Sequence, residues 1–274
     1  MQASFSPQSV PLLLDLSEKE THAYCKNKSK TAAGGSKAAR KIVITSGKGG
    51  VGKTTVCCNL GVQLARMGRR VIVCDLDFGL NNADVVLGVE NRALYDILDA
   101  VEGRCRPKQA LVTHPRYPAL SVLSSNRILE RYVSPQAIRL ILDTLAPQFD
   151  YVLIDSPAGI EDGFHRAASC AEEALLVTSP HISALRDADR VAGILKSYRF
   201  TRVGLIVNRM RKDFFKRGEI LAPAEIAELL RLPLTAVIAE EDRVLLENVV
   251  GKSRTFRSLA EAVDRTEEKT GRRR

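Results

Sequence analysis

The chain has no tryptophan, and aromatic residues fill only 5% of its 274 positions. It also lacks any run of about 20 apolar residues, the length that a helix needs to cross a bilayer. The first apolar run, residues 11–14, ends at Asp15 and has no basic segment before it. We therefore expect neither a secretory signal nor a membrane span, and a cytoplasmic protein.

Cysteine is present, but the cysteines lack the spacing of a redox pair or of a zinc site. The six cysteines form no C-x-x-C pair, and no histidine clusters with them as in a zinc site. Cys57, Cys58 and Cys74 lie in apolar segments, where a cysteine is usually a small buried hydrophobic residue. We expect all six to be reduced, which excludes a disulfide scaffold and a structural zinc module.

Negative charge is in deficit, because 41 Lys and Arg residues face 32 Asp and Glu residues, for a net charge of +9. This balance favours anionic partners such as nucleotides, nucleic acid or an acidic membrane. Much of the excess lies near the two ends of the sequence, where basic residues are often only solvated. Nucleic-acid binding is therefore not expected from charge alone.

The sequence divides into three parts. Residues 1–40 are rich in Ser, Lys and Gly without persistent periodicity, so we expect a flexible leader. Residues 41–268 contain no linker-like stretch and are expected to form one domain. Residues 269–274 form a basic tail.

Short apolar runs rich in Val, Ile and Leu alternate with helical segments through the expected domain. Such runs are typical of strands buried on both faces of a parallel sheet. Helices are expected at residues 54–67, 135–145 and 182–198, the last with Ile182 and Leu185 on its buried face. The fold class is α/β: a doubly wound, mainly parallel sheet flanked by helices. The expected strands are 42–45, 71–74, 120–123, 151–154, 174–178, 203–207 and 234–238.

The strongest motif is G-x-x-x-x-G-K-[ST], placed directly after the first expected strand and before the first expected helix. Glycines in such a loop allow backbone N–H groups to converge on phosphate oxygens, and the helix adds its positive end. Lys53 supplies a charge to the β- and γ-phosphates, and the Thr54 hydroxyl is a ligand for Mg²⁺. The motif is Gly47, Lys48, Gly49, Gly50, Val51, Gly52, Lys53 and Thr54.

Carboxylates follow two other expected strands. Asp75 and Asp77 stand two residues apart at one strand end, so that on an extended strand they would point the same way. Asp155 closes the apolar run 151–154, the arrangement of an aspartate that holds Mg²⁺ through water. Strand ends of an open parallel sheet face the ligand crevice, so all three are candidates for a nucleotide site.

The run from Lys48 to Thr55 resembles the deviant Walker A loop of the MinD/ParA family of ATPases. The resemblance implies an ATP·Mg²⁺-dependent homodimer in which Lys48 reaches the partner's phosphates. It also implies that Asp77 orients the attacking water, that Asp75 supports the magnesium shell and that Asn208 reads the adenine edge. Thr55 completes the phosphate-binding set.

Further stretches, among them residues 79–84, 95–98 and 186–190, resemble the septum-site branch of that family. That branch implies slow ATP hydrolysis, recruitment of a MinC-like septum inhibitor, release by a MinE-like activator and contact with the inner membrane face. Residues 265–274, however, have no apolar face for a membrane-surface helix, so we expect weak membrane binding.

Other functions remain open at this level. A ParA-type partition ATPase would share the loop and bind DNA non-specifically, and a MinD-like regulator of flagellar number would account for the leader. A nitrogenase-type iron protein is set aside because Cys105 and Cys170 lack glycine-rich settings. A P-loop metabolic kinase is the plain enzyme alternative, but nothing in the sequence marks an acceptor site.

Overall fold

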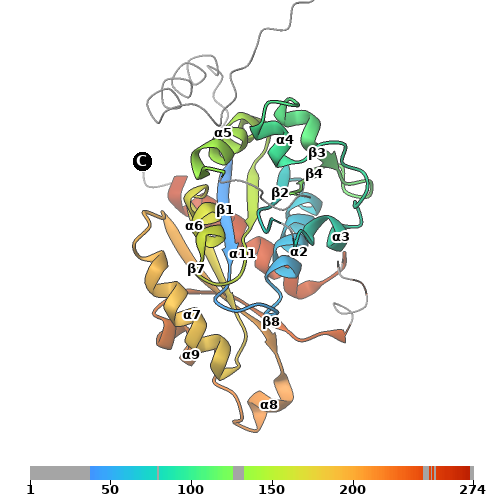
Figure 1. Ribbon diagram of the computed structural model, residues 1–274. Coiled ribbons are helices and arrows are strands. Elements are labelled where there is room, and N and C mark those ends of the chain that lie inside the picture. The colour runs from blue at the N-terminus through green and yellow to red at the C-terminus, as the bar shows by residue number, and fades with distance from the viewer. Residues whose placement is uncertain are drawn as a thin grey trace, which may run out of the picture.

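The structure is a computed structural model, and it describes residues 38–78, 80–125, 133–242, 247, 249 and 251–271, the last six of these by their backbone alone. Within them an eight-stranded sheet has the order β3-β4-β2-β5-β1-β6-β7-β8 (Figure 1). The strands are β1 (Arg40–Thr45), β2 (Val71–Asp75), β3 (Leu111–Thr113), β4 (Leu120–Leu123), β5 (Tyr151–Asp155), β6 (Glu173–Thr178), β7 (Arg202–Met210) and β8 (Leu234–Ala239).

Helices cover both faces of this sheet. One face is covered by α2 (Lys53–Arg66), α3 (Ala83–Leu87) and α11 (Arg254–Gly271), which share one apolar cluster with the strands. The other face is covered by α4 (Ile97–Val101), α5 (Pro135–Leu145), α6 (Asp162–Ser169), α7 (Ile182–Leu195) and α9 (Pro223–Leu230). The remaining short elements are η2 (Pro107–Ala110), η3 (Ala146–Gln148) and α8 (Lys212–Lys216), which extends from the body at the bottom of Figure 1.

The predicted fold class is confirmed, since every strand pairing is parallel except that of β3 with β4. The strand β3 was not predicted, because it is only three residues long. The seven expected strands are all present, and six of them have buried interiors as the patterns predicted. The expectation is wrong for β8, an edge strand in which only Ile238 is buried. Parallel strands place their carboxyl ends at one edge of the sheet, and that edge carries the predicted site residues.

The expected helix boundaries follow local capping chemistry. The Ser134 hydroxyl accepts a hydrogen bond from the Ala137 N–H at 3.2 Å, and Pro135 occupies the first turn of α5. Gly68 follows α2 with φ +84°, a conformation that glycine adopts without strain. In α11, Phe256, Leu259, Ala260 and Val263 are all at most 1% exposed, so this expected stripe is a core stripe.

One expectation about α7 is wrong. Leu185 is buried, but Ile182 is 87% exposed, and the helix ends at Leu195 rather than at residue 198. Ile182 is the first residue of the helix and stands at the carboxyl edge of the sheet, where no described element covers it. Helical periodicity gives direction around the axis but does not show where the neighbouring layer ends.

Five cysteines are free, and Cys57, Cys58 and Cys74 are fully buried as expected. Burial raises the pKa of all three thiols well above the ordinary value. These side chains therefore act as core residues and not as nucleophiles. Cys25, the expected leader through residue 37 and the last three residues of the tail lie outside the described residues.

Candidate functional site

The glycine-rich motif forms the turn between β1 and α2. Gly50 and Gly52 have φ values of +78° and +90°, and Gly52 is the N-cap of α2. Gly47 is required for a different reason: a Cβ there would lie 2.3 Å from the carbonyl oxygen of Asp187 in α7. The loop is thus held against a neighbouring helix by a backbone contact that tolerates no side chain.

Asn208, near the end of β7, packs against the same loop. Its side-chain Nδ2 donates to the carbonyl of Val51 at 2.7 Å, and a Cβ at position 52 would lie 2.5 Å from that nitrogen. Asn208 is 7% exposed. The structure therefore shows Asn208 bracing the loop, while its predicted recognition of adenine stays a prediction.

Lys53 forms the centre of a buried charge cluster. Its Nζ lies 2.9 Å from Oδ1 of Asp155, and the two side chains are 8% and 1% exposed. Burial alone would lower the pKa of Lys53, but the negative charges of Asp155 and then Asp75 outweigh it and raise the pKa. Lys53 is therefore held in its charged form at the start of α2.

Asp75 is the register partner of Asp155 on the adjacent strand. Its carboxylate accepts three backbone hydrogen bonds, from the N–H groups of Asp77 at 2.9 Å and of Asn82 and Ala83 at 3.0 Å. Burial, followed by the charge of Asp155, raises the pKa of Asp75 to about 7 in spite of these bonds. Asp75 thus has a structural role that the sequence did not indicate, which is to anchor the loop before α3.

Asp77 is not on a strand, because β2 ends at Asp75. The expectation that the two carboxylates alternate along an extended strand is wrong at this residue: the Asp77 N–H donates to the Asp75 side chain, which turns the chain. Asp77 is half-buried, and burial raises the pKa of its carboxyl group, while Lys53 opposes the shift. It remains close enough to Lys53 for the two charges to interact.

The residues at this edge fit a magnesium–phosphate ligand. Oδ2 of Asp155 is buried and has no hydrogen-bond partner among the described residues, so it is an acceptor that a bound ligand or water could satisfy. Carboxylate and hydroxyl oxygens are the donors that Mg²⁺ prefers. Thr54 and Thr55 lie half-buried in the first turn of α2, beside Lys53.

Lys48 lies away from this charge cluster. It is exposed, and its Nζ donates to the hydroxyl of Ser183 in α7 at 2.8 Å. Gly49 and Gly50 are also exposed. Ser183 was missed by sequence reasoning; its only signal is its place just after the carboxyl end of β6. The Gly159 N–H donates to the Ser46 carbonyl at 2.9 Å and ties the loop after β5 to the phosphate loop.

Exposed apolar side chains surround the phosphate loop. Leu80, Ile160 and Ile182 follow β2, β5 and β6, and they are 71%, 40% and 87% exposed. These strands and β1 are neighbours in the sheet, so the three residues emerge at one edge. Exposed apolar groups that gather in this way are typical of an interaction surface.

Comparisons with known proteins agree with this geometry. The ParA family model, described as NUBPL iron-transfer P-loop NTPase, matches residues 37–219. The septum site-determining protein MinD of Bacillus subtilis is 46% identical over 207 residues, which cover 74% of this chain and 77% of that protein.

Solved structures extend the similarity to the fold. The MinC:MinD cell division protein complex of Aquifex aeolicus matches with a TM-score of 0.76 and 38% identity, covering 82% of this chain and 96% of that one. MinD of Pyrococcus horikoshii complexed with Mg-ADP matches with a TM-score of 0.72 and 31% identity, covering 84% and 97%.

The sheet order, the glycine loop and the buried lysine–aspartate pair define a P-loop NTPase. The deviant lysine and the comparisons narrow the class: the chain belongs to the MinD/ParA family, on the side of the septum site-determining MinD proteins. Among the residues that the structure describes, no helix is both long and apolar enough to span a membrane.

Proposed function

We propose that this protein is an ATP-hydrolysing dimerisation switch of the MinD type that acts in division-site selection. In the ATP state two chains enclose two nucleotides, and hydrolysis separates them. The name of the septum site-determining relatives supports the cellular role, and the phosphate loop supports the chemistry. The single observation that carries the proposal is the position of Lys48.

Lys48 belongs to the phosphate loop, but its ammonium group is directed to Ser183 of α7. Lys53 already supplies the positive charge beside Asp155 inside the chain. Lys48 instead projects from the carboxyl edge, where its ammonium group donates to the Ser183 hydroxyl. A second copy facing this edge would receive its ammonium group near the phosphates, as a cation supplied from outside stabilises the charge of phosphoryl transfer.

The apolar groups around Lys48 give the second copy a surface to bury. Leu80 and Ile160 lie on loops after β2 and β5, and Ile182 begins α7; all three are exposed. Contacts between two copies related by a two-fold axis use the same patch on each, so these residues would be buried on both copies. The loops after β2 and β5 carry Asp77 and Gly159, so the same surface would sense the state of the nucleotide.

The residues have distinct roles in the proposed cycle. The loop N–H groups and Lys53 bind the phosphates, and Thr54 and Asp155 hold Mg²⁺, with Asp75 behind them. Magnesium neutralises phosphate charge when it is bound. Asp77 orients the attacking water as general base, and its raised pKa reflects a half-buried position. Turnover is slow, because a switch must persist long enough to be read.

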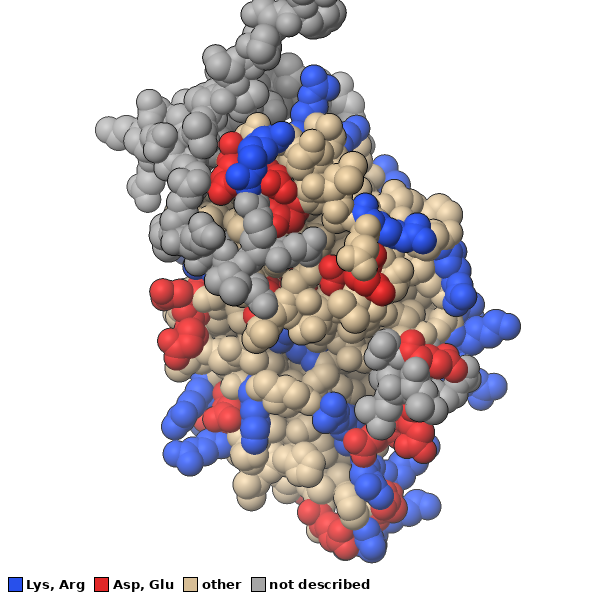
Figure 2. All heavy atoms as spheres, turned by 45° about the vertical axis from the view of Figure 1, so that its right-hand side comes forward, with Lys and Arg blue, Asp and Glu red and all other residues tan. Residues whose placement is uncertain are grey.

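The partners proposed are a MinC-like inhibitor, bound in the ATP state, and a MinE-like activator of hydrolysis. The MinC:MinD complex of Aquifex aeolicus, similar in fold over most of this chain, supports the first. Duplex DNA is not proposed as a partner. On the face shown in Figure 2, acidic side chains lie among the basic ones over most of the surface, whereas a nucleic-acid-binding face is typically lined by clustered Lys and Arg.

The test measures the oligomeric state of the full chain by light scattering, with Mg²⁺ and a non-hydrolysable ATP analogue. We expect a dimer for the wild type and for Asp77→Ala, whose turnover is lost. Lys48→Ala should bind the analogue but stay monomeric, and Lys53→Ala should bind no nucleotide. Lys196→Ala, which removes an exposed lysine after α7, is the matched control and should dimerise normally. A fully active, monomeric Lys48→Ala protein would contradict the cycle.

A further inference from the structure

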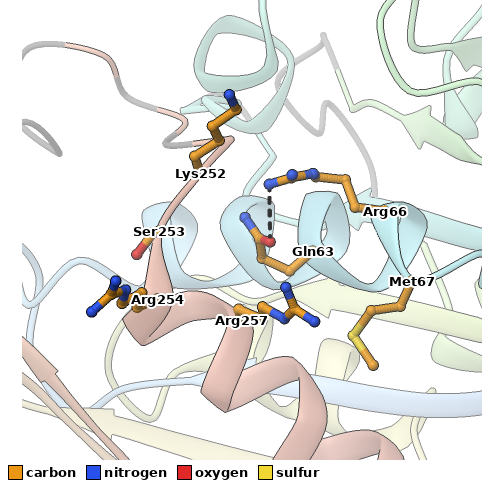
Figure 3. A pocket seen from close by; sticks show the side chains of 7 residues that line it. All are labelled: Gln63, Arg66, Met67, Lys252, Ser253, Arg254 and Arg257. Carbon is orange, nitrogen blue, oxygen red and sulfur yellow. Dashed lines mark hydrogen bonds between the residues drawn. The ribbon is translucent and has the colours of Figure 1, made fainter.

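A basic pocket lies far from the phosphate loop, between α2 and the beginning of α11 (Figure 3). It encloses about 430 Å³. The α2 side supplies Gln63, Arg66 and Met67, and the other side consists of Lys252, Ser253, Arg254 and Arg257. Since Lys53 begins α2 and Arg66 ends it, the pocket lies about 20 Å from the phosphate loop at 1.5 Å of rise per residue.

The charge of this pocket has one sign. Four of its seven lining residues are cations, and none is a carboxylate. Arg257 pairs with Glu261 at 3.0 Å, and Arg66 contacts the Gln63 side-chain oxygen at 3.5 Å. Lys252 and Arg254 have no ion pair within the described part of the chain. Two cationic groups are thus available to an anion from outside.

The N-terminus of α11 lies at the pocket, and its helix dipole increases the positive potential there. Ser253 is 6% exposed, and its hydroxyl caps the helix by accepting from the Phe256 N–H at 3.3 Å. The first turn holds no acidic residue, although acidic residues are favoured there. Cations at a helix N-terminus oppose the macrodipole, so helix stability does not explain Lys252 and Arg254 at this position.

The four cations of the pocket are exposed side chains on either side of Gln63, and Lys252 and Arg254 extend outward in different directions (Figure 3). Figure 3 shows the guanidinium groups of Arg66 and Arg257 on either side of Gln63, which is 2% exposed. Gln63 donates to the Gly251 carbonyl at 3.2 Å and so joins α2 to the segment before α11. Met67 adds an apolar wall, which an inorganic anion would not need but the carbon skeleton of an organic phosphate would contact.

We propose that this pocket binds a phosphate group carried by an organic ligand, with Lys252 and Arg254 as the principal contacts and Met67 against the carbon part. Guanidinium and ammonium groups form charge-assisted hydrogen bonds with phosphate oxygens. The same chemistry describes a soluble phosphate ester and the headgroup of an anionic lipid, and the experiment separates these two sources.

The test uses the full chain saturated with ADP and Mg²⁺, so that the phosphate loop is occupied. The pocket variant is Lys252→Gln with Arg254→Gln. The matched control is Lys196→Gln with Arg199→Gln, which removes the same charge from exposed positions after α7. Thermal unfolding verifies folding; the pocket variant should melt at or above the wild-type temperature, since two cations leave a helix N-terminus.

Pyrophosphate titrated in a calorimeter is the soluble probe, and vesicles of equal phosphatidylglycerol and phosphatidylcholine are the lipid probe. A loss of at least tenfold in either affinity in the pocket variant, with less than a twofold change in the control, supports the proposal and identifies the source. If neither probe binds, or if both variants lose affinity equally, the proposal is overturned.

Discussion

Replacing Lys53 by methionine should destabilise the nucleotide-free protein in a pH-dependent way. The Lys53–Asp155 pair is 8% and 1% exposed with a 2.9 Å separation, and Asp75 lies beside it. Removing one partner of a buried pair leaves an uncompensated charge, which costs about 3–5 kcal/mol. We therefore expect a loss in that range at pH 8, measured by urea unfolding without nucleotide.

The free energy of unfolding that Lys53→Met loses should be smaller at acidic pH than at pH 8. Without Lys53 the Asp75 carboxyl, whose pKa is already raised to about 7, would stay neutral over a wider pH range in the folded state. A raised carboxyl pKa means that the folded state holds a proton that the unfolded state has released. Stability then falls as pH rises from about 4 through the folded pKa, by up to about 1.4 kcal/mol per pH unit for each such proton. Between pH 5.5 and pH 8 the variant should lose up to about 3 kcal/mol more than the wild type.

A double-mutant cycle with Asp155→Asn measures the coupling directly. The matched control is Lys41→Met, because Lys41 is 7% exposed but its partners Asp143 and Glu172 are 38% and 45% exposed. Those carboxylates stay solvated, so the control should lose less and show little extra pH dependence. An equal loss for Lys53→Met at both pH values, or a coupling energy near zero, would refute the reasoning.

Three other predictions concern separate parts of the molecule. Ser183→Ala removes the hydrogen bond that holds Lys48 in the single chain, worth about 1 kcal/mol, and should tighten dimerisation with the ATP analogue a few-fold in analytical ultracentrifugation. Phe256→Ala should cost about 3–5 kcal/mol in urea unfolding, because this ring is 1% exposed in the α11 stripe. Burial lowers the pKa of His114, whose Nδ1 accepts from the N–H groups of Arg116 and Tyr117 at 3.1 and 3.2 Å. Its contribution is therefore present above about pH 6.5 and is lost as pH falls towards the folded pKa, a dependence that His114→Asn should not show in thermal unfolding.

The sequence by itself determined the features that depend on neighbouring residues. Buried parallel strands need continuous apolar runs, so seven of the eight strands could be found from pattern alone. The phosphate loop needs glycines at fixed spacing, and the start of α5 needs Ser134 as its cap. The three-residue β3 could not be found, since its strand geometry comes from pairing with β4.

Only the tertiary structure decided which distant residues meet. Lys53 and Asp155 are 102 positions apart, and Lys48 and Ser183 are 135 apart. The sequence places Asp77 two residues after Asp75, but the turn that takes it off the strand depends on a side-chain hydrogen bond. The basic pocket joins the end of α2 to the beginning of α11. Periodicity shows which side of a helix or strand is apolar. Whether a side chain is buried, and which charges it meets, depends on the element that packs opposite, and the order of strands in the sheet determines that element.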